Sequence, residues 1–74
     1  MSWCHRLDLV MGVGQNIRVA FIDGGLVRGK LLNVDANTLQ IEVIATQPRD
    51  RTDWEAEHHI DVFFKRLIGS YRFE

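Results

Sequence analysis

The segment 17–35 constrains the fold most strongly, because it carries both the alternation and the turn of a β-hairpin. Its first part alternates apolar and other residues, which indicates a strand with one buried face; the apolar positions are Ile17, Val19 and Phe21. Asp23-Gly24-Gly25 follows, and these residues accept the positive φ of a tight turn at little cost. Gly29, inside the second strand, predicts a bend, a bulge or a close backbone approach.

The rest of the chain continues this pattern of short strands. Trp3, Leu7, Val10 and Met11 recur at helical spacing and predict a helix over 2–11, capped by Ser2. The strands are expected at about 16–23, 25–35, 38–46, 58–68 and 70–73, with a charged loop over 47–57. The sequence therefore predicts one mostly β domain over 1–74, in which five bent antiparallel strands form a small barrel.

The small size of the chain also bears on assembly. With 74 residues it buries only about 60% of the surface that its unfolded form exposes, so its core alone is marginal. Cys4 is the only cysteine, which excludes an internal disulfide and fits a reducing cytoplasm. A metal or association of several copies is the other usual source of stability. In the Phe63-Phe64 doublet one ring faces the core and the other faces outward, and together with the marginal core this favours a homo-oligomer.

The hairpin and a later segment resemble a known family. Asp23-Gly24, Gly29 and Val34-Asp35 stand in the order and spacing of the first motif of Sm-like proteins. The segment 62–69, Val-Phe-Phe-Lys-Arg-Leu-Ile-Gly, is similar to the second motif, particularly in the form found in the bacterial RNA chaperone Hfq. The resemblance implies an SH3-like, Sm-like barrel with an N-terminal helix.

The resemblance also implies a function, a site and an assembly. Sm-like proteins form rings, so a pentamer to heptamer is expected, with single-stranded RNA bound at the pore. Asn37, Lys65 and Arg66 match the positions of the family's RNA site. Asn37 replaces the aromatic or histidine on which a base stacks in the family. Phe63 and Tyr71 lie in the strands that pair between neighbouring subunits of such rings.

A second interpretation is an oligomeric protein-interaction or assembly module with no role in nucleic-acid binding. The loop 47–57, with an exposed Trp54, is then the contact surface for a protein partner. A third is a small accessory protein that binds a small molecule. The net charge of −1 lacks the strongly basic balance of non-specific nucleic-acid binders, so any RNA site must be local.

The sequence offers no pattern for catalysis or for a metal. His58 and His59 are adjacent in an expected strand, so they point to opposite faces and do not readily share an ion. Gly12-Val13-Gly14 lacks the preceding strand of a dinucleotide-binding turn. We therefore expect no enzyme, no metal site and no cofactor. No apolar run approaches the length of a membrane span, and no secretory leader is apparent, so a cytoplasmic protein is expected.

Overall fold

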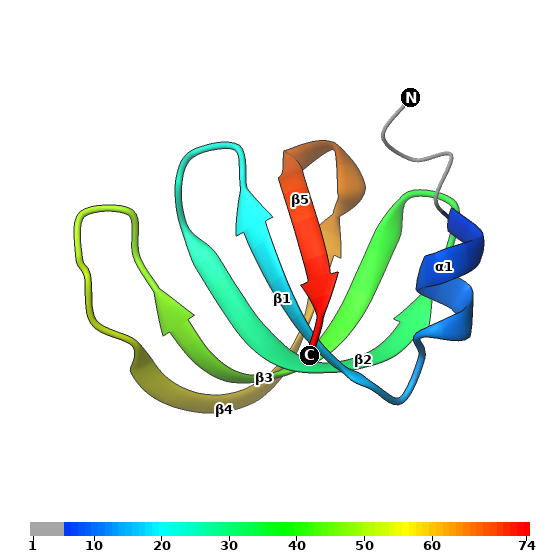
Figure 1. The fold of residues 1–74 in the computed structure, drawn as a ribbon, viewed down its shortest axis with the longest axis horizontal. Coiled ribbons are helices and arrows are strands. Elements are labelled where there is room, and N and C mark those ends of the chain that lie inside the picture. The colour runs from blue at the N-terminus through cyan, green and yellow to red at the C-terminus, as the bar shows by residue number, and fades with distance from the viewer. Residues whose placement is uncertain (1–5) are drawn as a thin grey trace.

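The computed structural model describes residues 6–74 as a mostly β structure with one short helix at its start (Figure 1). The helix α1 spans Arg6–Met11, and the strands are β1 (Asn16–Phe21), β2 (Leu26–Val34), β3 (Thr38–Gln47), β4 (Glu55–Phe64) and β5 (Ile68–Phe73). A single 3₁₀ turn, η2 (Lys65–Leu67), separates β4 from β5. The expected mostly β class is confirmed.

The five strands form one antiparallel sheet in the order β4-β3-β2-β1-β5. Figure 1 shows that the sheet curves strongly, with α1 beside one end of it. β4 and β5 are the two edges, and they do not pair with each other. The sheet is therefore open, and the hydrogen-bonded closure of the expected barrel is not observed.

The core lies on one face of this curved sheet. Alternate residues of β1, β2 and β3 are fully or almost fully buried there, and Leu9 of α1 is buried with them. The cluster consists of Leu9, Ile17, Val19, Val27, Leu31, Leu39, Ile41, Val43 and Ile68. The period of two that the sequence shows is thus the period of burial, because successive side chains of a strand point to opposite faces.

The turn between β1 and β2 forms as the Asp-Gly-Gly segment predicts. Gly24 adopts a φ of 99°, and its N–H donates to the carbonyl oxygen of Phe21 at 3.0 Å. The N–H of Gly25 donates to Oδ1 of Asp23 at 2.9 Å. Of the three turn residues only Gly24 uses the left-handed region, which a side chain would make strained.

Gly29 marks an irregularity of the β2–β3 pairing, as the sequence predicts. The register shifts between Arg28 and Gly29, and again between Leu31 and Asn33. A Cβ atom at Gly29 would overlap the backbone carbonyl of Glu42 on the neighbouring strand and lie 2.9 Å from Cγ2 of Ile41. The two backbones therefore approach each other more closely here than a side chain allows.

The two ends of β4 differ from the expected ones, and the start of the expected helix is not tested. Residues 2–5 of the expected helix lie outside the described residues. β4 begins at Glu55 rather than 58, because Thr46 and Ala45 of β3 pair with Glu55 and Ala56, so the loop shortens to 48–54. The last expected long strand ends at Phe64, where η2 turns the chain into β5. At the start of β4, pairing across the sheet rather than local composition sets the boundary.

In residues 6–74 no helix is long and apolar enough to cross a membrane.

Candidate functional site

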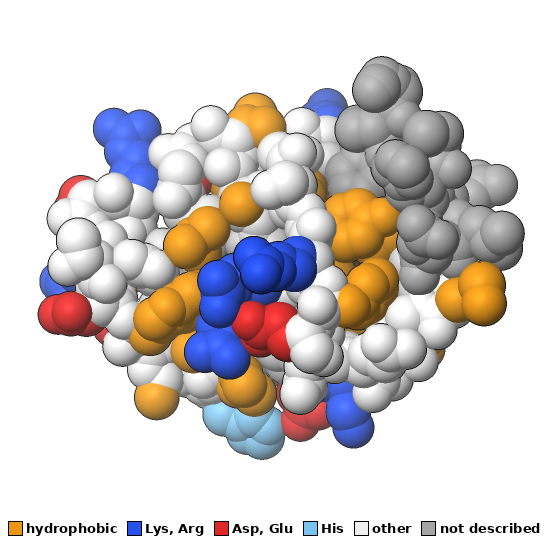
Figure 2. Space-filling view, viewed as in Figure 1, with side chains coloured by type: hydrophobic (Ala, Val, Ile, Leu, Met, Phe, Trp, Pro, Cys, Tyr) orange, Lys and Arg blue, Asp and Glu red, His pale blue; other side chains and the backbone are white. Residues whose placement is uncertain are grey.

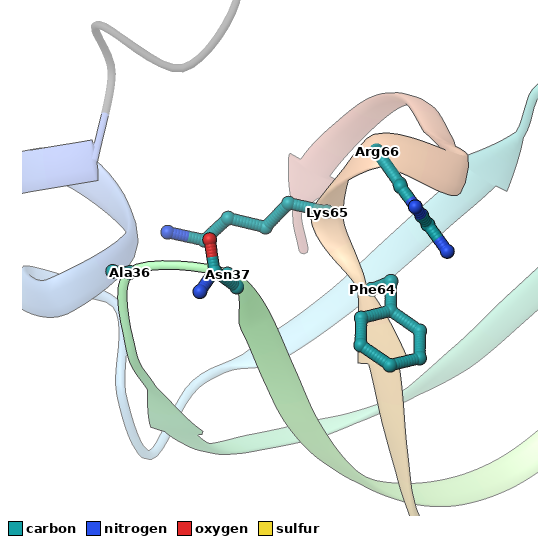
Figure 3. A pocket seen from close by; sticks show the side chains of 5 residues that line it. All are labelled: Ala36, Asn37, Phe64, Lys65 and Arg66. Carbon is teal, nitrogen blue, oxygen red and sulfur yellow. The ribbon is translucent and has the colours of Figure 1, made fainter.

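The two segments that carry the predicted site residues meet at one end of the sheet. The turn between β2 and β3 contains Asn37, and the end of β4 leads into Lys65 and Arg66 (Figure 3). The N–H of Lys65 donates to the carbonyl oxygen of Asn37 at 2.8 Å, and Thr38 pairs with Phe64. All three predicted residues therefore lie together, although 28 positions separate Asn37 from Lys65 in the chain.

Asp35 fixes the backbone of the turn that presents Asn37. Its Oδ1 accepts the N–H groups of Asn37 and Thr38, each at 2.8 Å, and its Oδ2 accepts the Thr38 hydroxyl at 2.8 Å. The N–H of Asp35 in turn donates to the carbonyl oxygen of Thr38 at 3.0 Å. Asp35 thus closes the turn from both its side chain and its backbone, as aspartate does in Asx turns.

These contacts also shift the titration of Asp35. The Asn37 N–H, the Thr38 hydroxyl and the Thr38 N–H hold the pKa of Asp35 below its ordinary value of 3.8, in that order of importance. The positive charge of Lys65 lowers this pKa further. The site therefore contains a carboxylate that stays ionised and holds the turn in place.

A pocket of about 420 Å³ opens between the two segments, lined by Ala36, Asn37, Phe64, Lys65 and Arg66. The Phe64 ring is 51% exposed, and the Arg66 guanidinium lies 5.4 Å from its centroid. Figure 3 shows these two side chains on one side of the pocket and Asn37 and Lys65 on the other. The lining thus combines an exposed aromatic face, a positive charge and an amide.

Lys65 differs from its neighbours in exposure. Asn37 and Arg66 are exposed, whereas Lys65 is only 4% exposed. Its side chain runs past Asn37 in Figure 3 instead of pointing into solvent. Lys65 therefore contributes its charge from beneath the surface of the pocket, while Asn37, Phe64 and Arg66 form that surface.

Phe64 is the site residue that the sequence interpretation missed. Asn37 in the turn predicts a pocket without a stacking surface, since the family's aromatic is missing there. The signal was present in the Phe63-Phe64 doublet, where adjacent strand residues must face opposite sides. Pairing of Phe64 with Thr38 brings the outward ring to the pocket.

The two residues expected at a subunit interface are half-buried within the chain. Phe63 packs against the core, with its ring 5.3 Å from that of Phe21. Tyr71 packs edge-on against Phe73, with ring centroids 5.9 Å apart. Both lie in edge strands, β4 and β5, and their place in an interface stays a prediction.

Trp54 is half-buried, not exposed as the sequence suggested. The guanidinium groups of Arg18 and Arg28 lie 5.8 and 5.4 Å from its ring centroid. The long charged loop had suggested a free indole, but the early start of β4 brings Trp54 back over the sheet.

The two histidines have different partners. His58 contacts Glu42 at 2.9 Å, whereas His59 lies 3.4 Å from Glu57 and 3.8 Å from Asp61. Within the part of the chain that the structure describes, no group of three His, Cys, Asp or Glu side chains is arranged to hold a metal ion.

Comparison with protein-family models found no match, and comparisons with curated proteins and with solved structures found no similar protein.

Proposed function

We propose that the chain is an Sm-like protein that assembles into a ring and binds single-stranded RNA at the pocket formed by Ala36, Asn37, Phe64, Lys65 and Arg66. The single observation that supports this most is the meeting of two motif segments, joined by the Lys65–Asn37 hydrogen bond of 2.8 Å. If the two segments resembled the motifs of the family only by chance, nothing would require them to meet in one pocket.

The chemistry of the pocket suits a nucleotide. A base stacks on an exposed aromatic ring, which contributes about 1–3 kcal/mol per base, and Phe64 supplies such a ring. The Arg66 guanidinium beside it suits a phosphate, and the Asn37 amide both donates and accepts hydrogen bonds. Stacking, charge and hydrogen bonding are all binding contacts, so the proposed activity is binding without catalysis.

The open sheet supports the ring part of the proposal. Among residues 6–74, β4 and β5 are both edges, and each leaves one row of backbone groups without a described strand beside it. Ile60 and Val62, on one face of β4, are 59% and 50% exposed. An apolar stripe on an edge strand suits a contact with another copy, and a ring would place several pockets around one pore.

The test is titration of fluorescently labelled U-rich and A-rich RNAs of about ten nucleotides at low and at moderate salt. We expect Phe64→Leu and Arg66→Gln each to weaken binding by about tenfold, in line with the loss of one stacked base or one charged contact. Arg49→Gln is the matched control, because it removes the same charge from the loop at the other end of β3.

Absence of binding by the unaltered chain at both salt concentrations would overturn the RNA-binding proposal. An equal loss in Arg49→Gln and Arg66→Gln would show a non-specific charge effect and would overturn the assignment of the pocket. A ring that binds neither RNA would leave the second interpretation, an assembly module.

A further inference from the structure

Three arginines stand in one row across the outer face of the sheet. Arg18 of β1 lies directly opposite Arg28 of β2 on one side and Arg72 of β5 on the other. Ile17 and Val19 on either side of Arg18 are buried in the core, and so is Val27 beside Arg28, so the side chains of this row point away from the core. Like charges directly opposite each other destabilise a sheet, so such a row is not expected from folding alone.

The same row continues into residues with small side chains. Arg28 pairs with Ala45, and Ala45 pairs with Ala56. Trp54, two residues before Ala56, reaches across this side of the sheet and places its ring over Arg28 and Arg18. The indole holds the two guanidinium groups beside each other by cation–π contact, which fixes their orientation.

A carboxylate already sits between these arginines. Glu74 contacts Arg18 at 2.9 Å and Arg28 at 3.1 Å, and Nε of Arg28 also donates to it at 3.2 Å. The three side chains are 38%, 37% and 25% exposed, so the group is open to solvent. Figure 2 shows basic side chains gathered around an acidic one in the middle of the molecular face.

The side-chain carboxylate of Glu74 does not balance the guanidinium groups on this face of the sheet. It carries one negative charge against the two positive charges of Arg18 and Arg28, and Arg72, opposite Arg18 in the register, adds a further positive charge to the row. Nε of Arg18 is also buried without a hydrogen-bond acceptor among the residues described. At neutral pH a phosphate group carries about one negative charge as a diester and about 1.5 to 2 as a monoester, with at least two acceptor oxygens, so it supplies charge and acceptors that Glu74 alone does not.

We propose that Arg18 and Arg28, which Trp54 orients, form a binding site for phosphate groups together with Arg72 beside them in the row, and that Glu74 occupies this site in the free chain. A phosphate group enters by replacing the Glu74 carboxylate between the two arginines. The forked geometry of guanidinium groups suits this exchange, because it accepts carboxylate and phosphate oxygens alike. The site is separate from the pocket at Asn37 and Arg66 and does not depend on it.

Trp54 provides a direct readout, because its emission responds to the charges beside its ring. A Trp3→Phe background leaves Trp54 as the only tryptophan. Pyrophosphate and a ten-nucleotide single-stranded RNA are titrated separately at constant ionic strength. Pyrophosphate tests free phosphate as the ligand, and the RNA tests the phosphodiester of a nucleic-acid backbone. The RNA titration uses a chain that also carries Arg66→Gln, so that the pocket does not contribute.

We expect a saturable change of Trp54 emission with at least one probe. Glu74→Gln removes the competing charge and should tighten binding by roughly fivefold, the upper range for an exposed ion pair. Arg18→Gln should weaken binding by at least about tenfold. Arg49→Gln, a charge-matched control in the loop 48–54, should leave it unchanged.

The absence of a saturable change with both probes, in the Trp3→Phe chain and in Glu74→Gln alike, would overturn the proposal. So would an equal weakening by Arg49→Gln and Arg18→Gln. Glu74→Gln alters only one exposed side chain, so it keeps the test valid if Arg18→Gln does not fold. Failure of the pocket proposal can be told apart from failure of this one. The pocket is tested by the effect of Arg66→Gln on RNA binding, whereas the arginine site is tested by the emission of Trp54 with pyrophosphate.

Discussion

At the scale of one residue, the sheet leaves no space for a side chain at Gly29. Its position is not a turn, and its backbone needs no left-handed conformation. The constraint comes from the facing strand, since a Cβ atom would overlap the Glu42 carbonyl. Backbone atoms of a paired strand cannot move aside as the end of a flexible side chain can.

We predict that Gly29→Ala lowers the free energy of unfolding by about 1–3 kcal/mol or more, the usual cost of inserting atoms where no space exists. The measurement is the urea midpoint at fixed protein concentration. Gly69→Ala in β5 is the matched control, because a Cβ there meets its nearest atom, the Ala20 carbonyl oxygen, at an ordinary 3.5 Å. Equal midpoints for the two variants would contradict the close approach of β2 and β3.

At the scale of the element, the turn between β2 and β3 depends on one ionised carboxylate. Asp35 accepts three hydrogen bonds within the turn, and these contacts lower its pKa. A carboxyl group whose pKa is lower in the folded chain than in the unfolded chain stabilises the fold above its unfolded pKa, about 3.9. That contribution is lost as the pH falls through the lower, folded value.

We therefore predict that Asp35→Asn is less stable than the unaltered chain at pH 7, and that this difference shrinks as the pH falls below about 4. Urea unfolding at pH 7 and at a series of acidic pH values measures it. Asp50→Asn, in the solvated loop 48–54, controls for the loss of one negative charge. A difference that stays constant down to the most acidic pH would show that the ionised form of Asp35 does not hold the turn.

At the scale of the whole molecule, the open sheet leaves its two edge strands on either side of a small core. The exposed stripe of Ile60 and Val62 belongs to one of these edges. Edge strands of this kind pair with other chains unless a charge or a bulge prevents it. In the proposed ring, β4 of one copy pairs with β5 of the next.

The prediction is a solution mass of five to seven times the chain mass of 8.6 kDa by light scattering. Val62→Lys places a charge on the exposed face of β4, so it should reduce the mass toward that of one chain without unfolding it. Lys30→Gln, an exposed position in the inner strand β2, is the control and should leave the mass unchanged. A single-chain mass for the unaltered protein would contradict the ring.

The sequence by itself determined the features that arise from neighbouring residues. Alternation over Ile17–Phe21 predicted a half-buried strand, the Asp23-Gly24-Gly25 turn predicted the hairpin, and Gly29 predicted an irregular pairing. All three are present, because side-chain period and turn conformation are properties of a short stretch of backbone. The choice of Asn37, Lys65 and Arg66 came from the resemblance, and these residues do lie together.

Only the tertiary structure decided which strands are edges, that the sheet stays open, and what faces the pocket. Phe64 joins Asn37 through the β3–β4 register, and Trp54 meets Arg18 and Arg28 through the early start of β4. The arginine row exists only because β1 lies between β2 and β5. These facts depend on contacts between residues far apart in the chain, whereas periodicity and turn residues describe only what lies within a few positions.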